Sequence, residues 1–310
     1  MKTSWLLFLL KYFFTRFLRR KLKLITSVLS SFGSLWLIIQ LSIFFFGEHS
    51  ALVSTVKSYW YLFLVFGILI AIIQTKPKNN FCCKLDNRDI SIEIVIGDLF
   101  KQDGSLVIGS NTTFDTRITR NLISEKSIQG QFTNIFYNKN ESQLDKEISL
   151  ELQGIEPEIL NENRVGKKER YPIGTVVKLT PKDKTIYMIA IADINEHGVA
   201  KTNYDNLRNA LAYLWVFISN KGLKENITIP ILGTGFSRLT QSREEIIREI
   251  INSFIAACSE STFCDKLTIV LNPFDIEKYK IDMEELEKYI FHVCKYTKFQ
   301  KSSEKIGQQI

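Results

Sequence analysis

Residues 227–257 read ITIPILGTGFSRLTQSREEIIREIINSFIAA, and this stretch decides the fold. An apolar run rich in isoleucine is followed by two glycines and then by apolar residues at helical spacing, which predicts a buried strand, a turn and an amphipathic helix. Ser242 stands before the helix and Glu245 comes three residues later, so we expect a capping box to start the helix here. Such a unit is typical of an α/β protein.

Five other segments have the short apolar or alternating pattern of strands. They are ISIEIVI from residue 90, SLVIGS from residue 105, GTVVKLT from residue 174, TIYMIAIAD from residue 185 and LTIVLN from residue 267. Helical patterns occur at about residues 125–137, 141–153, 202–221, 242–259 and 282–297. This alternation predicts an α/β three-layer sandwich around a mixed, largely parallel sheet over residues 90–298, followed by a polar tail over 299–310.

Two apolar segments precede this domain and predict a transmembrane helical hairpin. Residues 24–46 carry no charge and are long enough for a helix to cross a hydrocarbon core of about 30 Å. Residues 53–73 reach spanning length if Lys57 extends its ammonium group to the interface. We expect residues 1–23 to form a basic segment in the membrane interface, and the polar residues 76–89 to form a linker.

The positive charge of the chain lies beside the predicted spans. Its 40 Lys and Arg exceed its 33 Asp and Glu by a formal net charge of +7, and residues 2–23 alone contain seven cations. Basic residues outside both spans predict a multi-pass protein with cytoplasmic N- and C-termini. The rest of the chain is balanced in charge, which argues against a nucleic-acid partner.

Sequence motifs disfavour several classes of enzyme. Neither the P-loop pattern nor G-x-G-x-x-G occurs, which argues against an ATPase and a dehydrogenase. The five cysteines contain no C-x-x-C pair and the three histidines lie far apart, so no metal site is predicted. We expect no cofactor. Cys82 and Cys83 follow the second span, and their lipidation is left open by the sequence.

Candidate ligand-binding residues follow three predicted strands, at the places where open α/β sheets bind ligands. They are Asp98, Leu99, Asn111, Thr112, Thr113, Phe114, Asp115, Gly233, Thr234, Gly235 and Phe236. The glycine loop lets backbone amides approach a diphosphate, a carboxylate accepts from an exocyclic amine, and Asn and Thr suit ribose hydroxyls and phosphate oxygens. For residues 97–99 and 111–115, a solvated turn with an Asx cap is an equally good explanation on spacing alone.

Three of these features together resemble the macro domain, which binds ADP-ribose and related nucleotides. They are G-D-L at residues 97–99, a small residue followed by Asn at residues 110–111, and P-I-L-G-T-G at residues 230–235. The resemblance covers about residues 90–298. It implies that Asp98 contacts the adenine amine, Leu99 lines the adenine pocket, Asn111 lies near the distal ribose, and residues 233–236 hold the diphosphate.

The chain also departs from the hydrolytic macro domains, which carry a glycine-rich stretch soon after the Asn. Here residues 111–119 read NTTFDTRIT, and no glycine follows until Gly130. The segment FDTRITRNLISEKSIQGQF, residues 114–132, and the paired spans resemble a divergent macro branch of bacterial anti-phage defence. This branch is the membrane-bound type of ThsA effector in the Thoeris system.

That resemblance implies a signalling receptor of the bacterial inner membrane with no catalytic residues. A partner enzyme with a TIR domain would make an ADP-ribose derivative from NAD, such as a histidine conjugate, and the macro domain would bind it. Binding would drive the chain into a homo-oligomer that disrupts the membrane lipid, with abortive infection as the outcome. The required condition is that the nucleotide binds the assembled state better than the resting one.

Two other functions are compatible with the sequence. One is a membrane-tethered ADP-ribosyl hydrolase or phosphohydrolase, against which stand the missing glycine-rich stretch and the lack of a convincing acid and base pair. The other is a membrane anchor for a protein-binding domain. Nucleotide binding and product formation distinguish the three functions.

Overall fold

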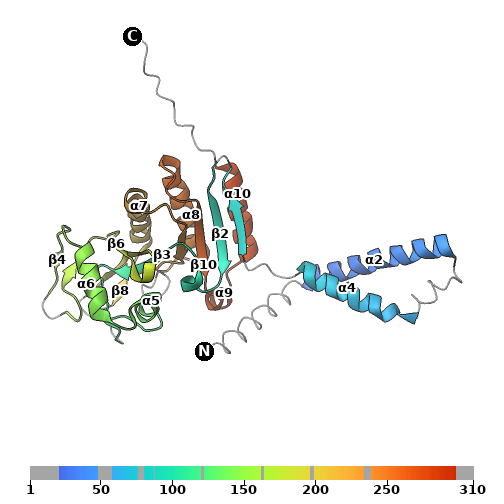
Figure 1. Cartoon of the computed structure of the whole chain (residues 1–310), viewed down its shortest axis with the longest axis horizontal. Coiled ribbons are helices and arrows are strands. Elements are labelled where there is room, and N and C mark those ends of the chain that lie inside the picture. Colours follow the sequence, from blue (N-terminus) through green and yellow to red (C-terminus); the bar gives the residue numbers. More distant parts are fainter. Residues whose placement is uncertain are drawn as a thin grey trace, which may run out of the picture. The chain divides into compact units, whose positions relative to one another are not determined.

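The computed structural model describes residues 21–47, 58–75, 80–86, 88–119, 122–161, 164–195, 199–233 and 239–297. The chain divides into two compact units, Met1–Asn79 and Asn80–Ile310, which are coloured along the sequence in Figure 1. Most of the predicted interfacial segment, residues 1–20, and the whole predicted tail, residues 299–310, lie outside the described residues.

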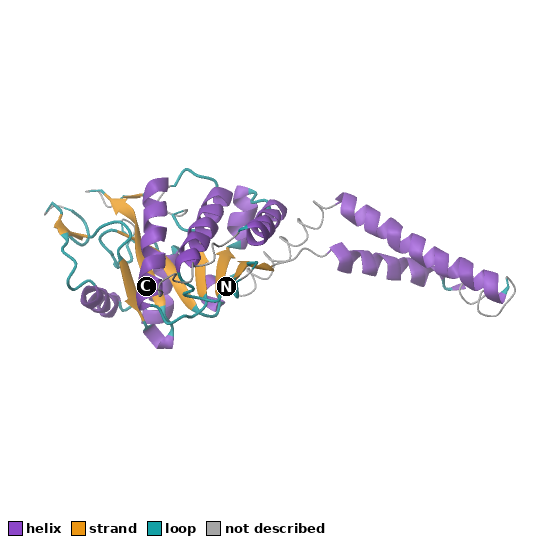
Figure 2. Ribbon diagram, turned by 90° about the horizontal axis from the view of Figure 1, so that it is seen from above, coloured by secondary structure: helices purple, strands orange, loops and turns teal. Residues whose placement is uncertain are grey.

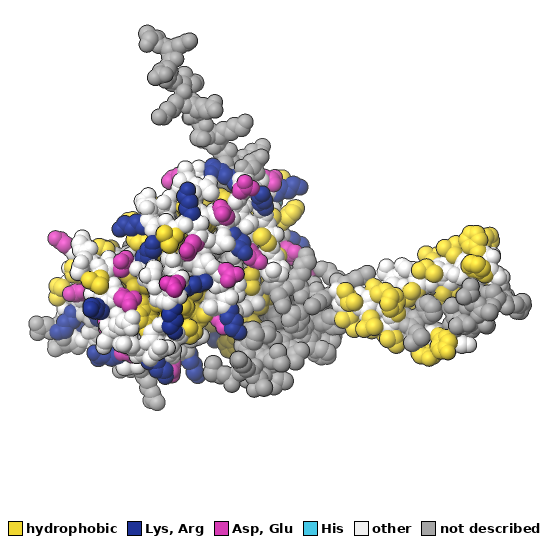
Figure 3. Space-filling model, viewed as in Figure 1, with side chains coloured by type: hydrophobic (Ala, Val, Ile, Leu, Met, Phe, Trp, Pro, Cys, Tyr) yellow, Lys and Arg dark blue, Asp and Glu magenta, His cyan; other side chains and the backbone are white. Residues whose placement is uncertain are grey.

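The N-terminal unit contains two apolar helices, α2 (Lys21–Phe46) and α4 (Trp60–Thr75). They pack together closely, since a Cβ atom built on Gly67 of α4 would lie 3.6 Å from Leu35 and 3.7 Å from Phe32 of α2. Their exposed side chains are mostly hydrophobic (Figure 3).

Only one of the described helices has the length and composition needed to cross a membrane. Its qualifying stretch, Ile25–Phe46 of α2, is 22 residues long and lies near the N-terminus. Helix α4 is 16 residues long, and residues 53–57 of the predicted second span lie outside the described part of the chain. The first predicted span is therefore matched by a helix of spanning length, and the full second span stays a prediction.

The second unit is built on an eight-stranded sheet in which the path β1-β2-β10-β9-β3-β7-β6 is extended by β8, paired to β7. The strands are β1 (Asn80–Lys84), β2 (Ser91–Ile96), β3 (Ser105–Asn111), β6 (Val176–Leu179), β7 (Ile186–Ile194), β8 (Ala200–Lys201), β9 (Ile227–Pro230) and β10 (Lys266–Leu271). Strands β2, β10, β9, β3 and β7 run parallel, and the others run antiparallel to their neighbours. All six predicted strands are present, and the mixed, mostly parallel sheet is confirmed.

Residues 80–84, which we expected to belong to a linker, form the edge strand β1. This strand pairs antiparallel with β2, from Asn80 opposite Val95 to Lys84 opposite Ser91. The polar composition of the segment hid a strand that is buried on only one side, with exposed and half-buried residues alternating along it. The compact unit thus begins at Asn80, before the first predicted strand.

Helices cover both faces of the sheet (Figure 2). They are α5 (Ile128–Tyr137), α6 (Glu141–Glu151), α7 (Tyr204–Lys221), α8 (Arg243–Glu260), α9 (Pro273–Tyr279) and α10 (Met283–Tyr296). The five predicted helices correspond to α5, α6, α7, α8 and α10. The capping box of α8 is confirmed: Ser242 accepts from the N–H of Glu245, and the Glu245 carboxylate accepts from the N–H of Ser242.

Neighbouring residues of β7 show how the two faces are packed. Met188 belongs to a buried cluster with Phe132 of α5 and Ile148 of α6. The next residue toward the N-terminus, Tyr187, points to the opposite face, where its ring packs edge-on against Phe217 of α7. Both faces are therefore buried, as in a three-layer sandwich. The short pieces β4 (Glu158–Ile159) and β5 (Glu169–Arg170) form a separate hairpin, and η2 (Pro181–Asp183) links β6 to β7.

Candidate functional site

The carboxyl ends of the parallel strands meet at one edge of the sheet. Leu271 of β10 pairs with Ile96 of β2, and its neighbour Val270 pairs with Pro230 of β9. The loops that follow Ile96, Pro230 and Asn111 therefore leave the sheet on the same side, where α/β sheets bind ligands. Asp98 and Leu99, the residues from Asn111 to Asp115, and Gly233 lie at or follow these strand ends.

Asp98 and Leu99 follow β2 and have different surroundings. The Asp98 carboxylate accepts a hydrogen bond of 3.0 Å from the N–H of Phe100 and caps the short helix η1 (Leu99–Lys101). Asp98 is half-buried. Leu99 is 7% exposed and packs in the main hydrophobic cluster. A contact of Asp98 with adenine stays a prediction.

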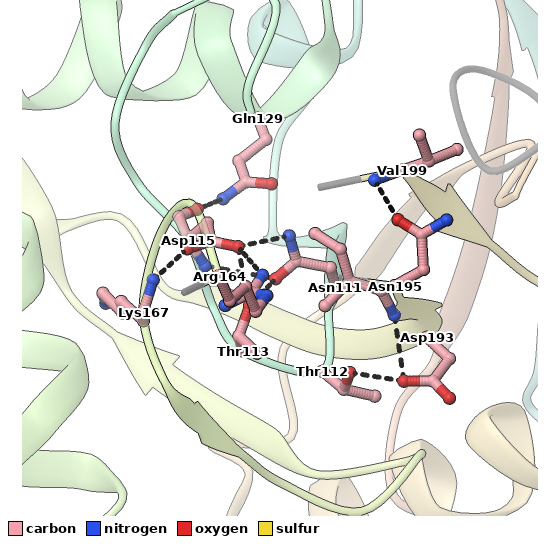
Figure 4. A network of polar contacts seen from close by, with 11 residues as sticks. Asn111, Thr112, Thr113, Asp115, Gln129, Arg164, Lys167, Asp193, Asn195 and Val199 are labelled. Atoms are coloured by element: carbon pink, nitrogen blue, oxygen red, sulfur yellow. Dashed lines mark hydrogen bonds and ion pairs between the residues drawn. The ribbon is translucent and has the colours of Figure 1, made fainter. Parts of the chain in front are cut away.

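The loop after β3 forms a buried polar network centred on Asp115, which is 1% exposed (Figure 4). Its carboxylate accepts from the Asn111 amide at 3.1 Å and from the Thr113 hydroxyl at 2.6 Å. The Asn111 side-chain oxygen in turn accepts from the Asp115 N–H at 3.1 Å. Gln129 of α5 donates to the Asp115 carbonyl at 2.6 Å. These side chains hold one another and fix the shape of the loop.

Two residues that the sequence analysis missed complete this network. Arg164 has a fully buried side chain and donates to the Asp115 carboxylate at 2.8 Å and to the Thr113 hydroxyl at 3.0 Å. The N–H of Lys167 donates to the other carboxylate oxygen at 2.8 Å. Between them Gly166 has φ +106, and a Cβ atom there would lie 2.5 Å from Asp115 Oδ1. The sequence R-V-G-K at residues 164–167 gives only a weak signal of this arrangement.

The Asp115 carboxylate is fully engaged within the protein. It accepts four hydrogen bonds, from two side chains of its own loop, from Arg164 and from the backbone of Lys167. Among the described residues, these bonds join the loop after β3 to residues 164 and 167 and hold the buried carboxylate in one position.

Thr112 links the same loop to the end of β7. Its hydroxyl donates to the Asp193 carboxylate at 3.1 Å, and its carbonyl accepts from the N–H of Tyr171 at 2.8 Å. Tyr171 also donates to Glu169 at 2.9 Å, and burial together with this carboxylate raises the pKa of Tyr171 to about 12. Segment 164–171 thus lies along the loop after β3 and is fastened to it at both ends.

Phe114 lies in the core of the domain. It has φ +48, which is unusual for a residue with a side chain, and its ring is 0% exposed. The ring packs edge-on against Tyr171, with the centroids 6.0 Å apart. In this conformation the ring is covered by the protein, and the predicted ligand-binding role of Phe114 stays a prediction.

The glycine loop after β9 is described only at its first residue. Gly233 has φ +71, a conformation that favours glycine, and its carbonyl accepts from the N–H of Leu239 at 3.3 Å. Thr234, Gly235 and Phe236 lie outside the described residues. This hydrogen bond joins the two described ends of the loop, Gly233 and Leu239.

A further cation lies at the start of α8, just after this loop. The guanidinium carbon of Arg243 lies 3.9 Å from the centre of the Tyr279 ring, in a cation–π contact, and the residue is 8% exposed. Asp275 of α9 lies near Arg243. Burial raises the pKa of the Asp275 carboxyl, and Arg243 and Lys278 partly offset this effect. The sequence analysis missed this group as well.

Comparisons with known proteins agree with this architecture. Residues 92–272 match the sequence profile of the family described as Thoeris protein ThsA, Macro domain. The Thoeris protein ThsA of Bacillus amyloliquefaciens (strain Y2) is 24% identical over an alignment of 229 residues, and the match covers 71% of this chain and 75% of that protein.

Solved structures of macrodomains are also similar to this chain. A mutant Oceanobacillus iheyensis macrodomain matches with a TM-score of 0.48 and 17% identity, covering 69% of this chain and 98% of that chain. The same macrodomain with ADP matches with a TM-score of 0.46 and 14% identity, covering 68% of this chain and 100% of that chain. The Trypanosoma brucei macrodomain in complex with ADP-ribose matches with a TM-score of 0.41 and 11% identity, covering 67% of this chain and 71% of that chain.

The parallel strands, the loops at their carboxyl ends and the profile match over residues 92–272, which is more than half of the chain, lead to one conclusion: this protein belongs to the ThsA macro domain family of the Thoeris system.

Proposed function

We propose that this chain is a membrane effector of Thoeris anti-phage defence, whose cytosolic macro domain binds an ADP-ribose-derived signal. The match to the ThsA macro domain over residues 92–272 is the observation that carries this proposal. The signal is made from NAD by a partner enzyme with a TIR domain, and a histidine conjugate of ADP-ribose is the candidate ligand. Binding drives homo-oligomerisation in the bacterial inner membrane, and the assembled helices disrupt it.

The ligand lies along the carboxyl edge of the parallel strands. Asp98, the half-buried carboxylate after β2, accepts from the adenine amine, with Leu99 beside it. Residues 233–236 hold the diphosphate through backbone amides, for which the positive φ of Gly233 begins a suitable turn. The loop of residues 111–115 lines the ribose side, and its buried network keeps that wall rigid before the ligand arrives.

The domain acts as a receptor and carries no catalytic residues of its own. Two observations support this part of the proposal. The loop after Asn111 lacks the glycines of the hydrolytic branch, and its carboxylate Asp115 is already saturated with donors. Binding energy is then available for changing the state of the membrane helices, provided that the nucleotide favours one state over the other.

Calorimetry on the full chain in lipid nanodiscs tests the binding step. The chain is titrated with ADP-ribose, with histidine-conjugated ADP-ribose and with GDP-ribose as a control for adenine recognition. We expect heat with the adenine ligands and a weaker response to GDP-ribose. No heat with either adenine ligand refutes the receptor function. Steady formation of a product from bound ligand refutes the non-catalytic part and favours the membrane-tethered hydrolase.

Dye leakage from liposomes containing the full chain tests the output step. We expect leakage only when a ligand that gave heat in calorimetry is added. If the ligand binds but no dye leaks, the nucleotide site stands and membrane disruption is refuted. Leakage that is independent of ligand refutes the gating.

A further inference from the structure

Helix α2 carries a stripe of exposed residues on the side directed away from α4. Going along the helix, six exposed residues follow one another at intervals of four, three, four, three and four. They are Thr26, Ser30, Gly33, Leu37, Gln40 and Phe44, here called the outer seam. This spacing is that of the a and d positions of a coiled coil, so the six residues share one stripe of the helix.

The contact with α4 occupies a different side of α2. Gly67 of α4 approaches Phe32 and Leu35, and Ser31 is only 8% exposed. At 100° per residue, Leu35 and Ser31 lie about 140–180° around the helix from Gly33 and Gln40, and Phe32 lies about 80–100° away. Among the described residues, the outer seam therefore lies apart from the contact between α2 and α4.

Gln40 is the first reason to expect a partner on the outer seam. It lies inside the 22-residue apolar stretch Ile25–Phe46, its side chain is exposed, and no hydrogen bond engages its amide among the described residues. By contrast, the hydroxyls of Ser31, Ser34 and Ser42 donate to carbonyls one turn earlier in the helix. An unsatisfied amide facing lipid is costly, so a partner that hydrogen-bonds to Gln40 is favoured.

Gly33 is the second reason. A Cβ atom built on Gly33 meets nothing within 4 Å, so the packing of this chain gives no cause for a glycine at this position. A glycine inside a helix costs stability relative to alanine. Small residues in membrane helices allow the backbones of two helices to approach closely. Gly33 lies one heptad before Gln40, on the same stripe.

We propose that the outer seam is the contact between α2 helices of two copies of this chain in the membrane, paired in parallel and in register through Gln40. This inference rests on the membrane location in the proposed function. All copies of one chain insert with the same orientation, so α2 meets α2 in parallel and Gln40 lies opposite Gln40. An amide both donates and accepts, and two copies around a twofold axis therefore satisfy each other.

Cysteine cross-linking in native membranes tests the geometry of this contact. The full chain carries Cys82→Ser and Cys83→Ser. These substitutions remove the exposed thiol of Cys82 and the half-buried thiol of Cys83, which could otherwise form cross-links of their own. Leu37→Cys reports on the outer seam, and Ile38→Cys is the control, since Ile38 is 59% exposed but points about 100° away. Under a mild copper oxidant, with and without ADP-ribose, we expect a disulfide-linked dimer from Leu37→Cys and much less from Ile38→Cys.

Three outcomes overturn the proposal. They are equal cross-linking of the two variants, no dimer with or without ADP-ribose, and capture of a different protein by Leu37→Cys. Resistance of the chain to alkaline extraction is measured in the same membranes. A chain that is extracted by alkali refutes the membrane location itself, and so separates failure of the proposed function from failure of the seam.

Energy transfer between labelled copies in liposomes tests the two residues on which the argument depends. We expect Gln40→Leu to weaken association about three- to twentyfold, the effect of losing one hydrogen bond between membrane helices. Gly33→Ile should block association while the helix content stays that of the parent, because the added side chain has free space within one copy. The control Ser42→Ala should have no effect, since that hydroxyl is bonded within its own helix. Unchanged association of Gln40→Leu and Gly33→Ile overturns the proposal.

Discussion

Removing Arg164 tests whether the network around Asp115 holds the loop after β3. In Arg164→Met, Asp115 remains buried without its cation, and breaking a buried ion pair in this way costs about 3–5 kcal/mol. Two side-chain donors and the N–H of Lys167 still reach the carboxylate, so we expect the lower end of this range, about 3 kcal/mol. For a domain of this size, that corresponds to a fall in Tm of about 6–12 °C.

The measurement is thermal unfolding of the full chain in detergent, followed by tryptophan fluorescence. Trp215 is 1% exposed and reports on the domain core. The matched control is Arg170→Met, which removes an arginine from a partly exposed pair with Glu158 and should cost about 1 kcal/mol or less. The double variant Asp115→Asn with Arg164→Met should recover part of the loss. If Arg164→Met and Arg170→Met melt within about 2 °C of each other, the network is not holding the domain together.

Three further predictions concern the binding edge. Gly233→Ala should strain the turn by about 1–2 kcal/mol and weaken nucleotide binding in calorimetry, whereas Gly154→Ala, which also has positive φ, should leave affinity unchanged; equal losses contradict the assignment of the loop. Asp98→Asn, which can still cap η1, should lose discrimination between ADP-ribose and GDP-ribose, and retained discrimination refutes the adenine contact. Because the folded pKa of Tyr171 is raised to about 12 from 10.0, its contribution to stability is present below pH 10 and is lost as the pH rises toward 12. In thermal melts between pH 10 and 12, Tm should fall less with rising pH for Tyr171→Phe than for Tyr213→Phe. An equal fall in the two variants contradicts the assignment of this stability to Tyr171.

Much of the fold could be predicted from sequence because its signals are local. The six strands are short apolar runs, and the start of α8 depends on two residues three positions apart, Ser242 and Glu245. The strand β1 could not be predicted in this way. Its residues are polar or half-exposed, and only pairing with β2 makes them a strand.

For the candidate site, the sequence predicts which strand ends meet but not the contacts made there. Glycines and polar residues after the strands mark the carboxyl edge of the sheet, because parallel strands end together. Arg164 and Asp115 are 49 residues apart, and nothing local marks them as partners. For the same reason, the sequence could not show that the side chains of Asn111 and Thr113 would be engaged with Asp115. Burial of a polar loop is decided by distant segments that cover it.

The pairing of β1 with β2 places the first residue of the domain beside the carboxyl end of β2. Because β1 is antiparallel to β2, Asn80 lies opposite Val95, three residues before Asp98. A displacement of the loop that carries Asp98 would therefore need to cross only one pair of strands to reach Asn80, where the second compact unit begins.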